Sequence, residues 1–421
     1  MLAQKRSSQR HGNTSKNAFG NTTLDDFLRV LSSASGRDMD AWAAAWLQTS
    51  GISTLSASVQ TADGHYSAVT LHQDAADPVS GKVSLRPHLL RLGLYATTAS
   101  GALERTGSVD VDLSGESVEV SALVGVQQPE LLLPNDEDLS YVRVRFDEHS
   151  LRTVLTSLDR ITDPLARALC WSSLWNMTRD AVLSADDYVT AICRFTPGET
   201  EDGVLATLLE TARTAVNSYT PVAQRDELRK KLLETVSEQL QTASAGSDVK
   251  LAWARSFAVL SRATSERNEL LRATLQGSGP AGLSIDSDLR WRILQALAAN
   301  GSADLAELDA ELAKDQSSTA AIGHRCAVAA QPEAGVKAAA WQQVVDADDL
   351  SNAQITATIE GFRAGSDALL ATYQAKYFSV LESVWASRSI DIQPNRARTL
   401  PQSRRGTRIS ARKAPRRSAS Y

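Results

Sequence analysis

Residues 66–73, Tyr66-Ser67-Ala68-Val69-Thr70-Leu71-His72-Gln73, decide the fold of the first third of the chain, because apolar and polar side chains alternate along them. A period of two places one set of side chains on the core face of a β-strand and the other set in solvent. Turn signals follow and precede the alternating stretches, as at Asp63-Gly64 and Ser114-Gly115. The same alternation recurs at residues 55–60, 88–95, 108–113 and 117–120. Short strands at this spacing predict a small all-β sandwich over residues 51–130.

Beyond Pro129 the periodicity becomes helical and stays so to about Ile392. The helical segments have lengths of about 10–20 residues and are separated by short breaks, for example at Pro197-Gly198 and Asn300-Gly301. Helix pairs that recur at a loose period of about 35–40 residues are typical of α-solenoids. Residues 131–392 are therefore predicted to form a large all-α superhelical domain, a HEAT-like solenoid. With 421 residues, the chain is expected to be multidomain.

Two short helices are expected before the strands. Asn21-Thr22-Thr23 offers N-caps for a helix over residues 24–33, which Gly36 ends. A second helix is expected over residues 39–47. In it Trp42 and Trp46 stand four residues apart on one face, the spacing of side chains that anchor a helix to a core.

The two ends of the chain differ in charge from its body. The last 28 residues, from Pro394, carry nine Lys or Arg and no acid, and the first twenty carry four Lys or Arg and no acid. Because the net charge of the whole chain is −5, residues 21–393 carry about −18. We expect an unstructured leader over residues 1–17 and a disordered basic tail over 393–421, since neither contains enough apolar side chains to order itself.

Composition excludes several classes of function. The acidic body argues against a specific nucleic-acid partner, although the basic tail could associate weakly with an acidic one. No run of eighteen apolar residues occurs, so no membrane span is expected. The three cysteines, Cys170, Cys193 and Cys326, lie far apart, which fits a reducing compartment and a cytoplasmic protein.

The sequence contains no recognisable catalytic or metal-binding motif. No two of the six histidines are four residues apart, so no HExxH helix can place two imidazoles on one zinc ion. His65 and His72 stand at separate strand positions with no cysteine near them. A G-x-S-x-G elbow, a P-loop and a dinucleotide-binding glycine pattern are also missing. We therefore name no catalytic and no metal-ligating residue, and the substrate-binding residues stay unknown.

Two other features invite a functional interpretation. The acidic run Asn135-Asp136-Glu137-Asp138 lacks the ligand spacing of a calcium loop and is interpreted as a solvated turn. Trp171 and Trp175 share a helical face with Arg179 one turn later. This pattern is typical of a core stripe with an arginine that reaches solvent, and a substrate-facing role is the alternative.

Several stretches together resemble the bacterial aminopeptidases N of the gluzincin superfamily, in particular the actinobacterial type. They follow the order of the family along residues 18–392. The stretches are 18–24 (AFGNTTL), 41–55 (AWAAAWLQTSGISTL), 133–141 (LPNDEDLSY), 174–180 (LWNMTRD), 288–294 (DLRWRIL), 350–352 (LSN) and 385–390 (WASRSI).

The resemblance implies three parts. Residues 18–50 would be a remnant of the last helices of the thermolysin-like catalytic domain, 51–130 the β-sandwich after it, and 131–392 the helical domain that caps the active site and admits peptides. In the family, a G-A-M-E-N strand holds the substrate N-terminus and HExxH with a distant Glu binds zinc. Neither motif occurs in this chain, so zinc is expected only in the full-length family and no cofactor in this chain.

Two hypotheses of function follow. In the first, the chain is the C-terminal substrate-chamber fragment of an aminopeptidase N and is inactive alone. In the second, it is a peptide or protein interaction module built from a sandwich and an α-solenoid. Peptides are the expected partner in both.

Overall fold

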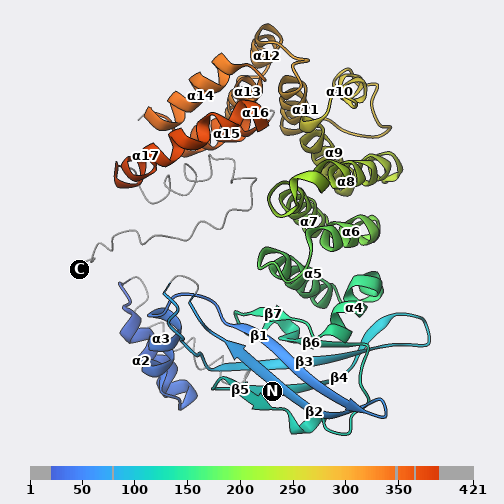
Figure 1. The fold of residues 1–421 in the computed structure, drawn as a ribbon, viewed down its shortest axis with the longest axis vertical. Coiled ribbons are helices and arrows are strands. Elements are labelled where there is room, and N and C mark those ends of the chain that lie inside the picture. Colours follow the sequence, from blue (N-terminus) through green and yellow to red (C-terminus); the bar gives the residue numbers. More distant parts are fainter. Residues whose placement is uncertain (1–19, 78–79, 347–348, 365–366, 388–421) are drawn as a thin grey trace. The chain divides into compact units, whose positions relative to one another are not determined.

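The computed structural model describes residues 20–77, 80–346, 349–364 and 367–387. The chain divides into two compact units, Met1–Leu183 and Ser184–Tyr421. The first unit contains the strands and the second is helical (Figure 1). A small β region followed by a large helical region confirms the coarse architecture expected from the sequence. The predicted leader and tail lie outside the described residues.

Unit 1 begins with two helices, α2 (Leu24–Ser35) and α3 (Met39–Leu47). The side chain of Thr23 accepts a hydrogen bond from the amide of Asp26, whose carboxylate bonds back to Thr23, and this capping box fixes the start of α2. Gly36 ends the helix in the left-handed conformation, with φ of 69°. Both predicted short helices are confirmed.

In the part of unit 1 that the structure describes, seven strands form two sheets. The strands are β1 (Thr54–Ala62), β2 (His65–Asp74), β3 (His88–Thr97), β4 (Leu103–Leu113), β5 (Ser117–Glu119), β6 (Leu131–Pro134) and β7 (Arg143–Arg145). The four-stranded sheet has the order β5-β2-β1-β7 and the three-stranded sheet the order β4-β3-β6. All pairs are antiparallel except β1 with β7. Alternating apolar side chains from both sheets, among them Leu55, Leu71, Leu90 and Leu92, share one core.

The strand region extends further along the chain than the sequence predicts. The prediction places only helices beyond residue 130, yet β6 and β7 both lie there. All four residues of β6 are buried, so this strand has no polar face and no period of two. The three residues of β7 are too few to show a period. Unit 1 then ends with two helices, α4 (Glu148–Ser157) and α5 (Pro164–Arg179).

Unit 2 consists of helices α6 to α17. Their bounds are α6 (Ala185–Phe195), α7 (Asp202–Thr214), α8 (Val222–Thr242), α9 (Asp248–Leu260), α10 (Asn268–Leu275), α11 (Ser287–Ala299), α12 (Leu305–Leu312), α13 (Ser318–Ala330), α14 (Ala334–Asp346), α15 (Asn352–Arg363), α16 (Asp367–Ala371) and α17 (Tyr373–Ser387). Polar N-caps begin six of these twelve helices: Ser184, Ser247, Asp286, Asp304, Ser317 and Ser351 each accept a hydrogen bond from a first-turn amide.

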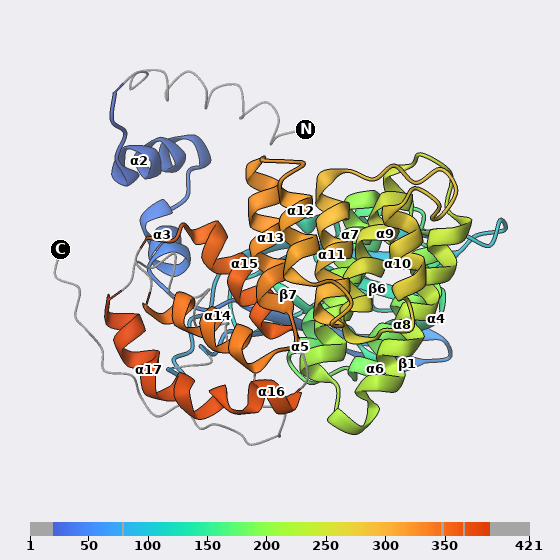
Figure 2. The ribbon, with the colours of Figure 1, turned by 90° about the horizontal axis from the view of Figure 1, so that it is seen from above.

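Alternate helices of unit 2 form a continuous row. Helix α7 packs on α9, α9 on α11, α11 on α13 and α13 on α15. Figures 1 and 2 both show α11, α13 and α15 side by side. The intervening helices pack on this row, as α8 does on α9, α12 on α13 and α14 on α15. We call the row from α7 to α15 the inner row.

Candidate functional site

Unit 2 contains a groove of about 830 Å³ along the inner row. Its lining residues come from α13, from its neighbours α11 and α15, and from the N-cap of α15. We call the α13 part the floor and the α11 and α15 parts the walls. None of the lining residues belongs to α10, α12 or α14. The lining residues are Asp288, Trp291, Arg292, Gln295, Ser318, Thr319, Ala321, Ile322, Gly323, Cys326, Ser351, Asn352, Ala353, Gln354, Thr356, Ala357 and Glu360.

Two glycines let the three helices approach closely. A Cβ at Gly323 would lie 2.4 Å from Cγ of Trp291, so α11 and α13 can pack only because the side chain is missing. A Cβ at Gly361 would lie 2.2 Å from the carbonyl oxygen of Cys326, which gives the same condition for α13 and α15. Contacts this short are not tolerated in packed cores. The glycines therefore set the spacing of floor and walls.

A polar network beneath the groove connects four helices of the inner row. Arg262, just after α9, donates to Oε1 of Glu360 on α15 at 2.7 Å and to the side-chain oxygen of Gln295 on α11. The Gln295 amide in turn donates to the carbonyl of Gly323 on α13 at 3.2 Å. Burial opposes ionisation of Glu360, but the Arg262 guanidinium outweighs it and the pKa of that carboxyl lies below its ordinary value.

A second set of ion pairs lies along the wall formed by α11. Oδ2 of Asp288 is 2.9 Å from Nε of Arg292, one turn later on the same helix, and 2.9 Å from Nε of Arg255 on α9. Asp286 also pairs with Arg255, at 2.7 Å. The charges that line the groove are thus compensated by neighbours of opposite sign.

A buried lysine holds the far ends of the floor and one wall together. Lys337 on α14 is fully buried. Its Nζ donates to the carbonyl oxygens of Ala329 and Ala330 at the end of α13, at 2.7 and 3.2 Å, and to those of Gly361 and Ala364 at the end of α15, at 3.0 and 2.5 Å. Burial lowers the pKa of Lys337 to about 8, so the group is still mostly an ammonium ion at pH 7. It caps both helices at once.

The groove contains one thiol, which is not activated. Cys326 is 2% exposed, and burial raises its pKa to about 12. A thiol becomes nucleophilic when its pKa is lowered, not raised. Cys326 therefore packs as a small apolar side chain.

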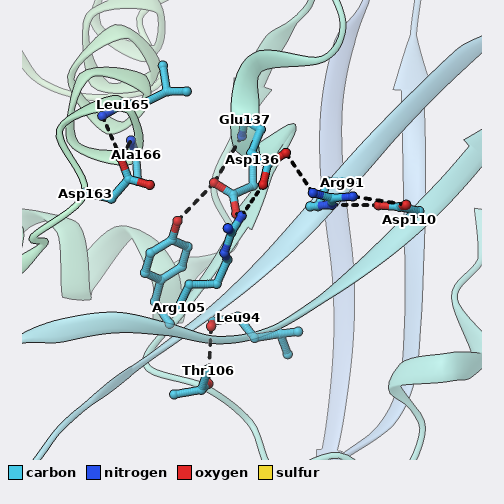
Figure 3. A network of polar contacts seen from close by, with 11 residues as sticks. Arg91, Leu94, Arg105, Thr106, Asp110, Asp136, Glu137, Asp163, Leu165 and Ala166 are labelled. Carbon is cyan, nitrogen blue, oxygen red and sulfur yellow. Dashed lines mark hydrogen bonds and ion pairs between the residues drawn. The ribbon is translucent and has the colours of Figure 1, made fainter. Parts of the chain in front are cut away.

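The acidic run of unit 1 is not the solvated turn expected from the sequence. Asp136 is 1% exposed; it accepts hydrogen bonds from the Tyr95 hydroxyl and from Arg105, both at 3.0 Å (Figure 3). Glu137 accepts from Arg105 and from Arg91, each at 2.7 Å, and these two guanidinium groups hold the pKa of Glu137 below its ordinary value.

The backbone of this turn explains why it needs such support. Asn135, Glu137 and Asp138 all have positive φ, at 59°, 67° and 52°. Side chains disfavour this region, so each such residue costs free energy that surrounding contacts must offset. The carboxylates pair with arginines of β3 and β4, and the turn thereby fixes the end of β6 on its sheet. The role is structural.

His65, His72, Trp171, Trp175 and Arg179, also singled out in the sequence, are not among the lining residues of the groove. His65 and His72 bond to the Asp63 carbonyl and to Ser58, at 2.8 and 2.9 Å. Trp171 is buried in α5 and Trp175 is half-buried, as expected of a core stripe, and Arg179 is exposed. Of the groove residues, Cys326 is one of the three cysteines noted in the sequence. Residues 288–294 and 350–352, two stretches quoted for the family resemblance, supply several others, but the sequence did not point to them as binding residues.

Comparison with protein families decides what the helical region is. Residues 131–399 match the family model described as the ERAP1-like C-terminal domain. The chain belongs to this family. It is also 41% identical over 380 residues to an aminopeptidase N of Streptomyces lividans, across 89% of this chain and 44% of that protein. The expected resemblance to the C-terminal portion of a bacterial aminopeptidase N is confirmed.

This chain shares its fold with a solved structure. The crystal structure of Legionella pneumophila aminopeptidase A in complex with aspartic acid matches with a TM-score of 0.57 at 14% identity, over 90% of this chain and 52% of that chain. At this identity the match shows the fold alone. The chain thus spans about half the length of the aminopeptidases it resembles.

The described residues do not offer ligands for the zinc ion expected in the full-length family. Within the ranges 20–77, 80–346, 349–364 and 367–387, no group of three or more His, Cys, Asp or Glu side chains could hold a metal ion. These residues do not fit a catalytic zinc site. Among the same residues, no helix has the length and apolar character needed to cross a membrane.

Proposed function

We propose that this chain is the substrate-chamber portion of an aminopeptidase N-type protein, which binds peptides but does not hydrolyse them alone. The observation that carries the proposal is the family match over residues 131–399, which includes every residue of the groove. The 41% identity to the Streptomyces aminopeptidase N supports peptides as the ligand class. The lack of HExxH and G-A-M-E-N in the sequence supports inactivity, because no residues are present to hold and activate a zinc-bound water.

The finer architecture is part of the same proposal. Two sheets that share one core support a β-sandwich, and the inner row with its outer helices supports a HEAT-like α-solenoid. We further propose the domain limits given by the sequence, except that the strand region continues past residue 130 to the end of β7. A cytoplasmic location and the lack of a specific nucleic-acid partner belong to the same proposal. The basic tail, with nine positive charges and no acid, would bind an acidic partner weakly at most.

Activity and metal content test the first half of the proposal. The purified chain should release no product from aminoacyl-anilides and should contain no stoichiometric zinc, with the Streptomyces lividans aminopeptidase N as the active control. One zinc ion per chain together with activity that a chelator removes would contradict it.

Peptide binding tests the second half. Fluorescence anisotropy with labelled peptides of about six residues should show saturable binding to the purified chain. The alternative, a peptide or protein interaction module, also expects peptide binding, so this assay separates the two hypotheses only partly. A chain that binds neither short peptides nor zinc would remove the support for a substrate chamber.

A further inference from the structure

The groove along α11, α13 and α15 presents several polar atoms that have no partner within the described residues. Arg292 uses Nε for its bond to Asp288, which leaves Nη1 and Nη2 free. Glu360 accepts from Arg262 through Oε1 and leaves Oε2 free. The side-chain amide of exposed Asn352 makes no hydrogen bond to a described residue. The groove thus offers donors on one wall and an acceptor on the other.

Between these polar atoms the lining is apolar. Ala321 and Ala353 are exposed there and Ile322 is half-buried, whereas Trp291 is buried and is held in place against Gly323. A volume of about 830 Å³ lies within the range of about 300–1,000 Å³ that is usual for small-molecule sites. A few residues of extended chain fit this space, with side chains on the apolar surface and the main chain within reach of the polar atoms.

The charges of the groove do not favour a ligand of either sign. Asp288 is neutralised by Arg292 and Arg255, and Glu360 by Arg262. What remains is hydrogen-bonding capacity: forked donors on Arg292, an acceptor on Glu360, and both kinds on Asn352. A peptide main chain offers the complementary set at every residue, one N–H donor and one C=O acceptor.

We propose that this groove binds an extended peptide segment through its main chain, with little regard to side-chain charge. Arg292 donates to peptide carbonyls and Glu360 accepts from a peptide amide. The apolar side chains of the groove contact alternate side chains of the peptide. Arg262 is a positioning residue, because it holds the Glu360 carboxylate without facing the ligand. The inference rests on the proposed function, since it assigns that function's peptides to one site.

Two exposed alanines provide a matched test on the full chain. Ala321 lies in the groove on α13, and Ala338 lies on α14 outside it; both are exposed and helical. Ala321→Trp should weaken a labelled, end-blocked Ala/Ser hexapeptide at least tenfold in anisotropy titrations, whereas Ala338→Trp should leave its Kd within twofold. Thr319→Trp, also exposed in the groove, should repeat the loss if Ala321→Trp folds poorly by circular dichroism.

The mode of recognition is tested on the ligand. N-methylation of alternate amides in the hexapeptide should weaken binding at least tenfold, while replacing one Ser by Lys or by Glu should change Kd less than threefold. Equal Kd values for Ala321→Trp, Thr319→Trp and Ala338→Trp would overturn the site and leave peptide binding by the chain intact. Binding that ignores N-methylation but follows side-chain charge would overturn main-chain recognition. If the unchanged chain binds no hexapeptide at all, the proposed function itself fails.

Discussion

Replacing Lys337 by Met tests whether one ammonium group holds the ends of α13 and α15 together. The buried Nζ has three N–H donors and four carbonyl acceptors within 3.2 Å. Met has a similar length but donates no hydrogen bond, so Lys337→Met removes the donors and leaves the helix-end carbonyls without them.

The size of the effect follows from two opposing terms. Three hydrogen bonds from a charged donor contribute about 2 kcal/mol each, or about 6 kcal/mol. Burial of the charge opposes this: a pKa of about 8 in place of 10.5 corresponds to about 3 kcal/mol, which the Met variant regains. The net loss is about 3 kcal/mol. For a helical unit of this size, that lowers Tm by about 6–12 °C.

Thermal and urea unfolding followed by circular dichroism at pH 7 measure the loss. Lys230→Met is the matched control, because the side chain of Lys230 is 74% exposed and its 3.9 Å contact with Glu234 contributes little. The reasoning is refuted if Lys337→Met melts within a degree of the unchanged chain. Such a result would mean that the carbonyls find other donors or that relief of the buried charge balances the lost bonds.

Three further predictions concern single side chains. His88 is buried, and its burial together with the nearby Arg86 charge lowers its pKa to about 4. The unfolded chain takes up this proton near pH 6.5, so the free energy of unfolding should fall as the pH drops from 6.5 to 4. His88→Asn should flatten this slope in urea titrations. Asp136→Asn should cost about 2–4 kcal/mol by the same assay, and Asp110→Asn, on a side chain 60% exposed, below about 1 kcal/mol. Gly323→Ala should cost about 1–3 kcal/mol of stability through its contact with α11, whereas Gly335→Ala should cause no comparable strain, because a Cβ there meets open space. Similar melting curves for Asp136→Asn and Asp110→Asn, or for Gly323→Ala and Gly335→Ala, would contradict the respective prediction.

Periodic segments could be predicted from the sequence because their burial is one-sided. Residues 66–73 alternate and lie in β2, and the helical periodicity expected beyond Pro129 corresponds to helices such as α13 and α15. By contrast, β6 is buried on both faces and has no period to detect. Local pattern thus identifies elements that have a solvent face, and misses those without one.

The candidate site could not be predicted for a different reason. The burial of Asp136 depends on Tyr95 and Arg105, which lie 41 and 31 residues earlier in the chain. The groove depends on three helices that single glycines such as Gly323 allow to pack closely. In the sequence, a glycine inside a helical pattern only weakens the prediction of a helix there and does not indicate a close contact. These side chains come together only because residues far apart in the sequence pack against one another, and a single sequence does not reveal such contacts.

The placement of β6 leads to a last prediction, about fragments of unit 1. A cut at residue 130, where the sequence suggests the sheet region ends, removes β6 from its place beside β3 and β7 from its place beside β1. Leu131, Leu132 and Leu133 are 0–1% exposed, and loss of their burial removes about 6 kcal/mol at about 2 kcal/mol for each side chain.

Most domains of this size have only about 5–15 kcal/mol of stability, so a fragment of residues 20–130 should be largely unfolded. A fragment of residues 20–183 retains both strands together with α4 and α5, and should unfold cooperatively. Amide exchange and urea titrations of the two fragments provide the measurement. Cooperative unfolding of 20–130 with a midpoint equal to that of 20–183 would contradict this prediction. It would show that β6 and β7 contribute little to the stability of the sheets, and that residues 20–130 contain all that the strand region needs to fold.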